Sequence, residues 1–135
     1  MNDSVIKTEK YFVDTFVRKD RRERLWYELS HPNRRYRGLS RFCHQSTDLL
    51  RPDKILLSGK DLMWQEHFQE FVKKDTGQCL ILSPDASFDG RTCQLCDAVA
   101  LCMMCLDASI VVGGHFAIVN SEAMQGGSDH FLLVE

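Results

Sequence analysis

The residues with the clearest chemical character in this chain are arginines, which gather with aromatic side chains between residues 18 and 41. Nine of the seventeen lysine and arginine residues lie in this basic window, against three acidic residues. A guanidinium group donates paired hydrogen bonds to a phosphate or a carboxylate, and aromatic rings offer surfaces on which nucleic-acid bases stack. The basic window therefore predicts a surface that binds an anionic partner. Its candidate binding residues are Arg18, Arg21, Arg22, Arg24, Trp26, Arg34, Arg35, Tyr36, Arg37 and Arg41.

The rest of the chain has the opposite charge. Residues 42–135 carry thirteen acidic and six basic side chains, so the net charge of −2 conceals a strongly polarised chain. Such polarity steers and orients the approach of a charged partner. The alternative interpretation is that the arginines pair internally with these carboxylates or form a solvated helix face. The overall pI near 6.2 argues against a dedicated nucleic-acid-binding domain, which is usually basic.

A second candidate site is the loop at residues 83–92, between an expected strand and an expected helix. A loop in this position directs backbone N–H groups towards an anion. It lacks a glycine-rich phosphate-binding pattern, and the simpler interpretation is that Asp89 caps the helix. The loop also matches the first half of a calcium-binding loop, but Cys96 occupies the position that requires a bidentate glutamate, so we expect no calcium there. The candidate anion-binding or ligand-binding residues are Ser83, Asp85, Ser87, Asp89, Arg91 and Thr92.

Four of the six cysteines form two CxxC pairs, a spacing that is common in zinc sites. The segment that carries them, residues 92–107, contains helix-forming residues and no glycine or proline. On a helix, at about 100° per residue, the thiols of Cys93 and Cys102 point in opposite directions, so four thiolates cannot converge on one ion. We therefore expect a buried helix with free thiols, as in a reducing cytoplasm, and neither a metal nor a cofactor.

The sequence contains no catalytic motif of high specificity. The five histidines lack the spacing of a metal site, and Cys43 and His44 are adjacent on an expected helix and face different directions. His115 and His130 fall on strands that we expect to pair. An enzyme or a small-ligand site would require one of these histidines to converge with the loop at residues 83–92. The sequence thus favours a protein without enzymatic activity and leaves this alternative open.

The spacing of apolar residues predicts one α/β (α+β) domain that spans residues 1–135. Residues 1–50 are predicted to be helical, and residues 51–135 to alternate between strands and helices. The predicted strands are 54–58, 79–83, 110–120 and 130–134, and the predicted helices between them are 61–74 and 92–107. The strand at 110–120 is expected to bend at its two central glycines and to pair antiparallel with the last strand. The expected fold is a helical N-terminal third packed on a mixed sheet of about four strands, with a C-terminal antiparallel pair.

These patterns predict a small cytoplasmic protein that binds another protein through its arginine-rich surface, as an immunity protein, an antitoxin or an adaptor does. The alternatives are binding of RNA or single-stranded DNA through residues 18–41, and a ligand site or active site at residues 83–92. The N-terminus lacks a signal-peptide pattern, and no apolar run is long enough to cross a membrane. The apolar segment at residues 110–134 would provide an edge for a homodimer.

Overall fold

The computed structural model describes residues 3–75, 77–104, 108–121 and 130–135. The helices are α1 (Asp3–Phe16), α2 (Arg22–Ser30), α3 (Pro32–His44), α4 (Ser46–Leu49), α5 (Glu66–Lys74) and α6 (Leu95–Met104), with short 3₁₀ helices at Lys19–Arg21, Pro52–Lys54 and Leu62–Trp64. The strands are β1 (Ile55–Gly59), β2 (Gln78–Leu82), β3 (Thr92–Gln94), β4 (Ser109–Val112), β5 (Phe116–Asn120) and β6 (His130–Val134).

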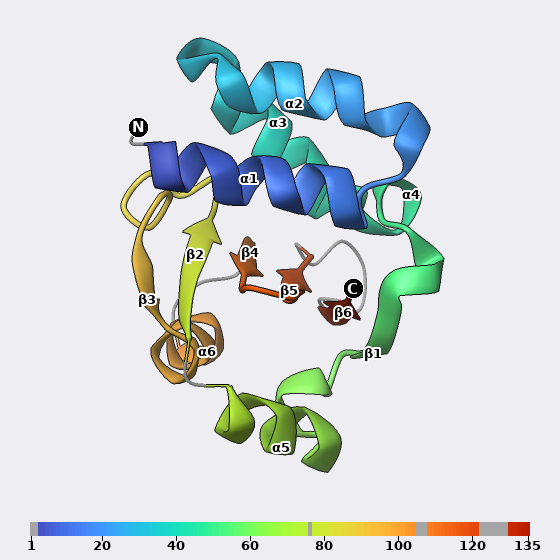
Figure 1. Cartoon of the computed structure of the whole chain (residues 1–135), viewed down its shortest axis with the longest axis vertical. Coiled ribbons are helices and arrows are strands. Elements are labelled where there is room, and N and C mark those ends of the chain that lie inside the picture. Colours follow the sequence, from blue (N-terminus) through green and yellow to red (C-terminus); the bar gives the residue numbers. More distant parts are fainter. Residues whose placement is uncertain (1–2, 76, 105–107, 122–129) are drawn as a thin grey trace.

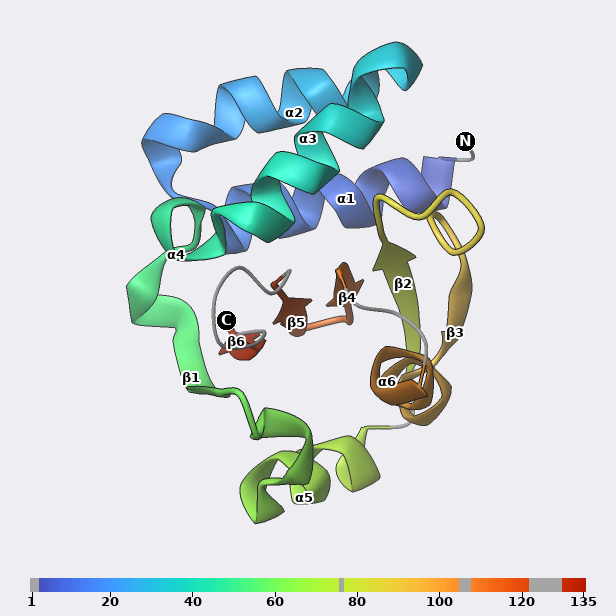
Figure 2. The same ribbon diagram turned by 180° about the vertical axis from the view of Figure 1, so that it is seen from behind.

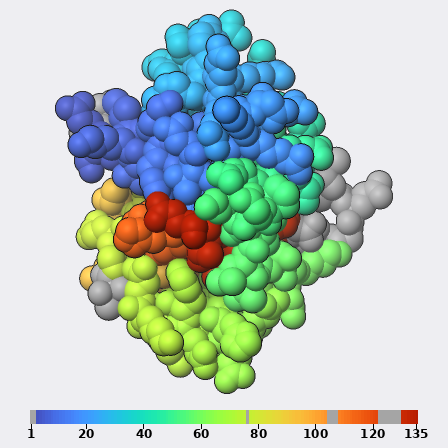
Figure 3. Space-filling model, turned by 45° about the vertical axis from the view of Figure 1, so that its right-hand side comes forward, coloured from blue at the N-terminus to red at the C-terminus, as the bar shows by residue number. Residues whose placement is uncertain are grey.

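These elements form a single α+β domain of three layers, with one sheet between two groups of helices (Figure 1). Helices α1, α2 and α3 cover one face of the sheet, and α5 and α6 cover the other, as the view from behind also shows (Figure 2). In the space-filling view the N-terminal helices occupy one end of the molecule and α5 the other, while the C-terminal residues reach the surface between them (Figure 3). Within the described residues, no helix is both long and apolar enough to span a bilayer.

The described strands form one six-stranded sheet in the order β1-β6-β5-β4-β2-β3, and every neighbouring pair is antiparallel. The predicted α+β class with a helical N-terminal third is confirmed, as is the antiparallel pairing of the last strand with the one before it. The expectation of a mixed sheet was wrong, and so was the count of about four strands with a C-terminal pair. Two local differences account for the extra strands.

The first difference lies at Gly113 and Gly114. The segment predicted as one bent strand is a hairpin, in which β4 and β5 pair along Ser109↔Asn120 to Val112↔Ala117. A Cβ atom on Gly113 would lie 2.2 Å from the ring of Phe116, so only glycine lets the chain fold back so closely over that ring. The two glycines therefore mark a turn, where the sequence analysis placed a bend.

The second difference lies at the start of the predicted helix 92–107. Residues Thr92–Gln94 form the edge strand β3, which pairs with β2 through Cys79↔Cys93, and the helix begins only at Leu95. The helix is also not buried all round, because Cys96 is exposed while Leu95 is fully buried. Similarly, the helix predicted at 61–74 is a 3₁₀ turn followed by α5.

Successive residues of each central strand face different helical layers, as the pleat of a strand requires. In β2, Leu82 packs in the core beneath α1–α3, whereas its neighbour Ile81 packs in the core beneath α5 and α6. Both side chains are fully buried. The sheet is thus shared by two separate apolar cores.

Helices α2 and α3 are joined at His31 and Pro32 and pack against each other. Pro32 occupies the first turn of α3, where its missing N–H costs no hydrogen bond. Gly38 allows the two helices to approach, since a Cβ atom at this position would lie 2.8 Å from Cβ of Glu28. This helix pair carries most of the basic window.

Candidate functional site

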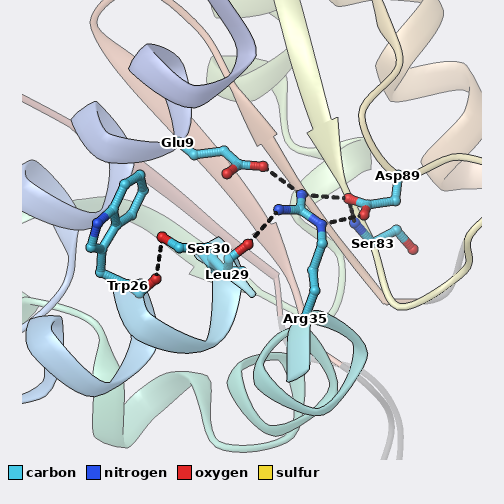
Figure 4. A network of polar contacts seen from close by, with 7 residues as sticks. All are labelled: Glu9, Trp26, Leu29, Ser30, Arg35, Ser83 and Asp89. Carbon is cyan, nitrogen blue, oxygen red and sulfur yellow. Dashed lines mark hydrogen bonds and ion pairs between the residues drawn. The ribbon is translucent and has the colours of Figure 1, made fainter. Parts of the chain in front are cut away.

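Arg35 is buried where α1, α2, α3 and the loop at residues 83–91 meet (Figure 4). Its Nε and Nη2 atoms donate to the two carboxylate oxygens of Asp89 at 2.6 and 3.0 Å, and Nη2 also donates to Glu9 Oε1. Its Nη1 donates to the backbone oxygen of Leu29 at 3.2 Å. Arg35 is 8% exposed and Glu9 is 2% exposed. A buried guanidinium with two carboxylates is a structural cross-link, so Arg35 does not contribute to a binding surface.

The pKa values of Glu9 and Arg35 are shifted by different causes. Burial raises the pKa of Glu9 above its ordinary value, and the contacts with Arg35 only partly oppose this effect. Burial lowers the pKa of Arg35, but the hydrogen bonds to Asp89 and Glu9 outweigh it and raise the pKa overall. The guanidinium therefore stays charged, and Glu9 is the partner whose ionisation is costly.

The candidate loop at residues 83–92 satisfies its own polar groups. Asp89 Oδ1 accepts from the backbone N–H of Ser83, and Asp85 Oδ1 accepts from that of Ser87. Ser83 Oγ accepts from the backbone N–H of Asp85 and donates to the backbone oxygen of Ala108. The expected role of Asp89 as a helix cap was wrong, because its carboxylate binds Arg35 and no helix begins at this point.

Residues 90–92, at the end of this loop, do not have the helix N-terminus that the expected anion site requires. Arg91 is exposed and stacks on Phe88, with its guanidinium carbon 4.9 Å from the ring centroid. Thr92 begins the strand β3, so residues 90–92 do not form a helix N-terminus. Within the loop, Ser83, Asp85 and Asp89 accept hydrogen bonds from its backbone, and Asp89 also anchors the loop to Arg35.

His115 and His130 lie at opposite ends of the β5–β6 pair. His115 follows the β4–β5 turn and contacts Glu135 Oε2 at 3.2 Å, with 87% of its side chain exposed. His130 is paired with Asn120 at the other end of the same strands. The two histidines therefore do not share a site, because the pairing Phe116↔Val134 to Asn120↔His130 separates them along the strands.

Several arginines of the basic window bind backbone oxygens of the chain itself. Arg18 Nε donates to the oxygen of Leu50 at 3.0 Å, and Arg22 Nε donates to that of Val17 at 2.9 Å. Arg21 remains exposed, 3.8 Å from Asp20. These three residues lie before or at the start of α2. Arg18 holds the residue that follows α4, and Arg22 holds the residue that follows α1.

Glu28 is the acidic centre of the α2–α3 pair. Its carboxylate forms an ion pair with Arg41, without the geometry of a hydrogen bond, and lies 3.7 Å from Arg24 Nε. The side chain of Glu28 is 7% exposed and that of Arg24 is 70% exposed. Trp26 is half-buried against the helical core, with Lys10 Nζ 5.0 Å from its ring centroid. Trp26 is therefore a packing residue rather than a free stacking surface.

Part of the exposed basic window lies along α3. A hollow of about 520 Å³, which we call the α3 groove, is lined by Tyr36, Arg37, Ser40, Arg41, His44 and Gln45. Tyr36 is 68% exposed at one end of the groove. Near the α2–α3 turn, Arg34 lies over the ring of the exposed Tyr27, 5.9 Å from its centroid. Among the described residues, none of those that line the groove is acidic.

Three of the six groove residues, Tyr36, Arg37 and Arg41, were predicted from the sequence, whereas Ser40, His44 and Gln45 were not. The missed signal is the helical spacing of Tyr36, Ser40 and His44, which recur every four residues and so share one face of α3. Cys79, Cys93 and Cys96 carry free thiols, and Cys105 lies outside the described residues. The described ranges contain no group of three or more His, Cys, Asp or Glu side chains arranged to hold a metal ion.

Comparisons of the chain with family models, with curated proteins and with solved structures find no match.

Proposed function

We propose that the protein binds an acidic segment of another protein through the α3 groove. The observation that supports this most directly is the exposed Tyr36 beside Arg37 and Arg41, in a hollow whose described lining residues include no acid. Guanidinium groups take carboxylates with paired hydrogen bonds, and a tyrosine offers a rigid amphipathic contact. The groove therefore suits a short segment that carries aspartate or glutamate next to an apolar residue.

The floor of the groove is partly ordered before any partner binds. Arg41 is only 18% exposed and is held by the buried carboxylate of Glu28. Tyrosine has few rotatable bonds, so fixing Tyr36 in a complex costs little conformational entropy. A site that is ordered in advance retains more of its contact energy as affinity.

Two features support the proposal of an acidic protein segment, in place of RNA or single-stranded DNA, as the ligand. Arg35 is buried in a cross-link, and Arg18 and Arg22 bind backbone oxygens of the chain, so these three guanidinium groups are less available to a phosphate backbone. The acidic excess of residues 42–135 would also repel a polyanion that extends beyond the groove. A short acidic segment meets neither obstacle. The proposal places the protein in the cytosol, where its thiols stay reduced.

The test compares two charge reversals on opposite layers. Arg37→Glu changes the groove, whereas Lys74→Glu changes an exposed residue at the end of α5, on the other side of the sheet. The probe is a short fluorescent peptide rich in glutamate and aspartate with one central leucine, titrated at low salt. We expect Arg37→Glu to weaken binding by roughly tenfold or more and Tyr36→Ala to weaken it severalfold, since central aromatic and arginine residues dominate such contacts. Lys74→Glu should bind as the wild type does.

Two results would contradict the proposal. One is equal binding of the acidic peptide by the two charge-reversed variants, which would show that any affinity is non-specific. The other is tighter binding of oligo(U) or oligo(dT) than of the peptide, with a steep loss as salt rises and with the same dependence on Arg37 and Tyr36. That second result would establish nucleic-acid binding in its place.

A further inference from the structure

A second hollow lies between the first turns of α1 and the strands β2, β3 and β4. Its volume is about 360 Å³, and we call it the α1–sheet pocket. Sites for small molecules in proteins have volumes of about 300–1,000 Å³, so this pocket is large enough for a small ligand. It shares no described lining residue with the α3 groove. The pocket is therefore a separate candidate site.

The floor of the α1–sheet pocket is apolar. Strand β2 pairs with both of its neighbours at Leu80, which lies opposite Thr92 of β3 and Val112 of β4. Residues directly opposite each other in antiparallel strands have their side chains on the same face of the sheet. Leu80 and Val112 are buried in the core beneath α1–α3, and Val5 of α1 packs in the same core. The floor thus offers an apolar surface to a ligand.

The rim of the pocket carries uncharged polar groups. Ser4, Thr8 and Thr92 contribute hydroxyl groups, and Gln78 contributes an amide. Thr8 is half-buried and the other three are exposed. Thr8 Oγ1 donates to the backbone oxygen of Ser4 at 3.0 Å, and its oxygen can also accept. Because hydroxyl and amide groups both donate and accept, the rim suits a ligand group that does the same, such as an amide or an alcohol.

The lining of the pocket discriminates against ions. None of the described residues that line it carries a charge at neutral pH. Cys79, which also borders it, keeps its proton because burial raises the pKa of this thiol to about 12. Asp3 and Lys7 belong to the same turns of α1 but border a neighbouring hollow. Removal of an ion from water is costly unless an opposite charge offsets it, so a neutral ligand is favoured here.

We infer that the α1–sheet pocket binds a small uncharged molecule, with an apolar body on Leu80 and Val112 and an amide or hydroxyl group at the rim. Thr92 acts on both parts of such a ligand, because its side chain belongs to the rim and stands beside Leu80 of the floor. The inference is independent of the proposed function, since no residue of the α3 groove takes part in it.

The first test compares three probes of nearly equal size and different charge: benzamide, benzoate and benzylammonium. Each is titrated at neutral pH into wild-type protein with isotope-labelled leucine and valine methyl groups, and NMR signals of Leu80 and Val112 report on the floor. We expect benzamide to shift these signals saturably and the two ions to bind at least about tenfold more weakly, because the lining offers no opposite charge. Absence of a saturable shift with benzamide would overturn the inference, as would an ion that binds as tightly.

The second test changes the pocket. Thr92→Tyr places a ring beside Leu80 and fills the space, whereas Thr92→Val keeps the shape and removes the hydroxyl group. Thr47→Tyr, at an exposed residue of α4, is the matched control. We expect benzamide binding to be lost in Thr92→Tyr, to be about threefold or more weaker in Thr92→Val and to stay unchanged in Thr47→Tyr.

Circular dichroism confirms that each variant is folded. If Thr92→Tyr does not fold, the comparison of Thr92→Val with Thr47→Tyr decides together with the three probes. Benzamide binding that is the same in the folded Thr92 variants as in the wild type would place its site elsewhere and contradict the inference.

Discussion

At the scale of single residues, neighbouring arginines of the basic window have opposite roles. Arg34 is exposed over Tyr27, whereas Arg35 is buried between two carboxylates. Adjacent residues on a helix differ by about 100° in direction, and Arg35 shares its face with Leu39 and Phe42, four and seven residues later. Its position on the buried stripe of α3 explains why it needs charged partners from other elements.

Replacement of Arg35 by methionine should therefore cost far more stability than the same change at Arg34. Arg35→Met leaves Glu9 and Asp89 close together without a cation, and removal of one member of a buried ion pair costs about 3–5 kcal/mol. Arg34→Met alters an exposed side chain, where changes stay within about 0.5 kcal/mol. Urea denaturation of the two variants gives both values. Equal effects would mean that the buried triad contributes nothing specific.

The raised pKa of Glu9 predicts the direction of a pH effect. A carboxyl whose pKa is higher in the folded than in the unfolded state holds its proton more tightly when folded, so its contribution to stability falls as the pH rises. The effect begins near the ordinary value of 4.5 and extends above it. Glu9→Gln keeps an oxygen acceptor for Arg35 and cannot ionise.

The measurement is the free energy of unfolding of the wild type minus that of Glu9→Gln, followed from acidic to neutral pH. This difference in free energy should be constant at pH values below the ordinary pKa of Glu9. Above that pKa it should fall, because only the wild type loses stability as Glu9 ionises. The contributions of the other carboxyl groups are the same in both proteins and cancel. A difference that moves in favour of the wild type as the pH rises would show that Arg35 outweighs the burial of Glu9.

The sequence located the basic window but could not predict which groups its arginines would contact. Arg35 and Asp89 are 54 residues apart, and each belonged to a different predicted site. Local periodicity reports which face of a helix is buried, and it carries no information about which distant carboxylate meets that face. For the same reason, the sequence could not show that Asp89, in the loop offered as an alternative ligand site, binds Arg35.

At the scale of elements, the predicted helices and strands were largely confirmed where apolar spacing changes clearly along the chain. The hairpin of β4 and β5 was missed because both strands are buried on both faces, so the apolar residues run on without alternation. In such a run only the glycines indicate the turn, and a pair of glycines is consistent with a bend or a reversal. The close packing of Gly113 on Phe116 decides between them, and it is a tertiary contact.

The approach of α2 to α3 predicts that Gly38→Ala destabilises the protein, although alanine is the better helix former by about 1 kcal/mol. The added methyl would lie 2.8 Å from Cβ of Glu28, which cannot move without the helix, and overpacking of this kind costs about 1–3 kcal/mol. Gly114→Ala is the matched control, because its methyl meets no heavy atom within 4 Å. Thermal denaturation should show a lower midpoint for Gly38→Ala and an equal or higher one for Gly114→Ala. A stabilised Gly38→Ala would show that the helices can separate without cost.

At the scale of the whole molecule, the charge asymmetry of the sequence is only partly expressed on the surface. Arg35 and Arg41 form ion pairs with carboxylates of the chain itself, and one of these, Asp89, comes from the acidic remainder of the chain. Other basic residues stay exposed, among them Arg21 and Arg24 near α2 and Arg37 in the α3 groove. The polarity seen in the sequence therefore contributes to both the fold and the proposed binding surface.

The three-layer architecture predicts that the two cores unfold together. Ile81 and Leu82 are adjacent in β2, fully buried and in contact with opposite cores, so each substitution to alanine should cost about 2–5 kcal/mol. Trp26 packs against the helical core and reports its unfolding by fluorescence, in a Trp64→Phe background that removes the other, exposed tryptophan. Because both cores share the sheet, we expect Ile81→Ala to lower the urea midpoint seen by Trp26 about as much as Leu82→Ala does. If Ile81→Ala leaves that midpoint unchanged while the circular dichroism signal acquires a second, earlier transition, the layers unfold independently and the sheet does not couple them.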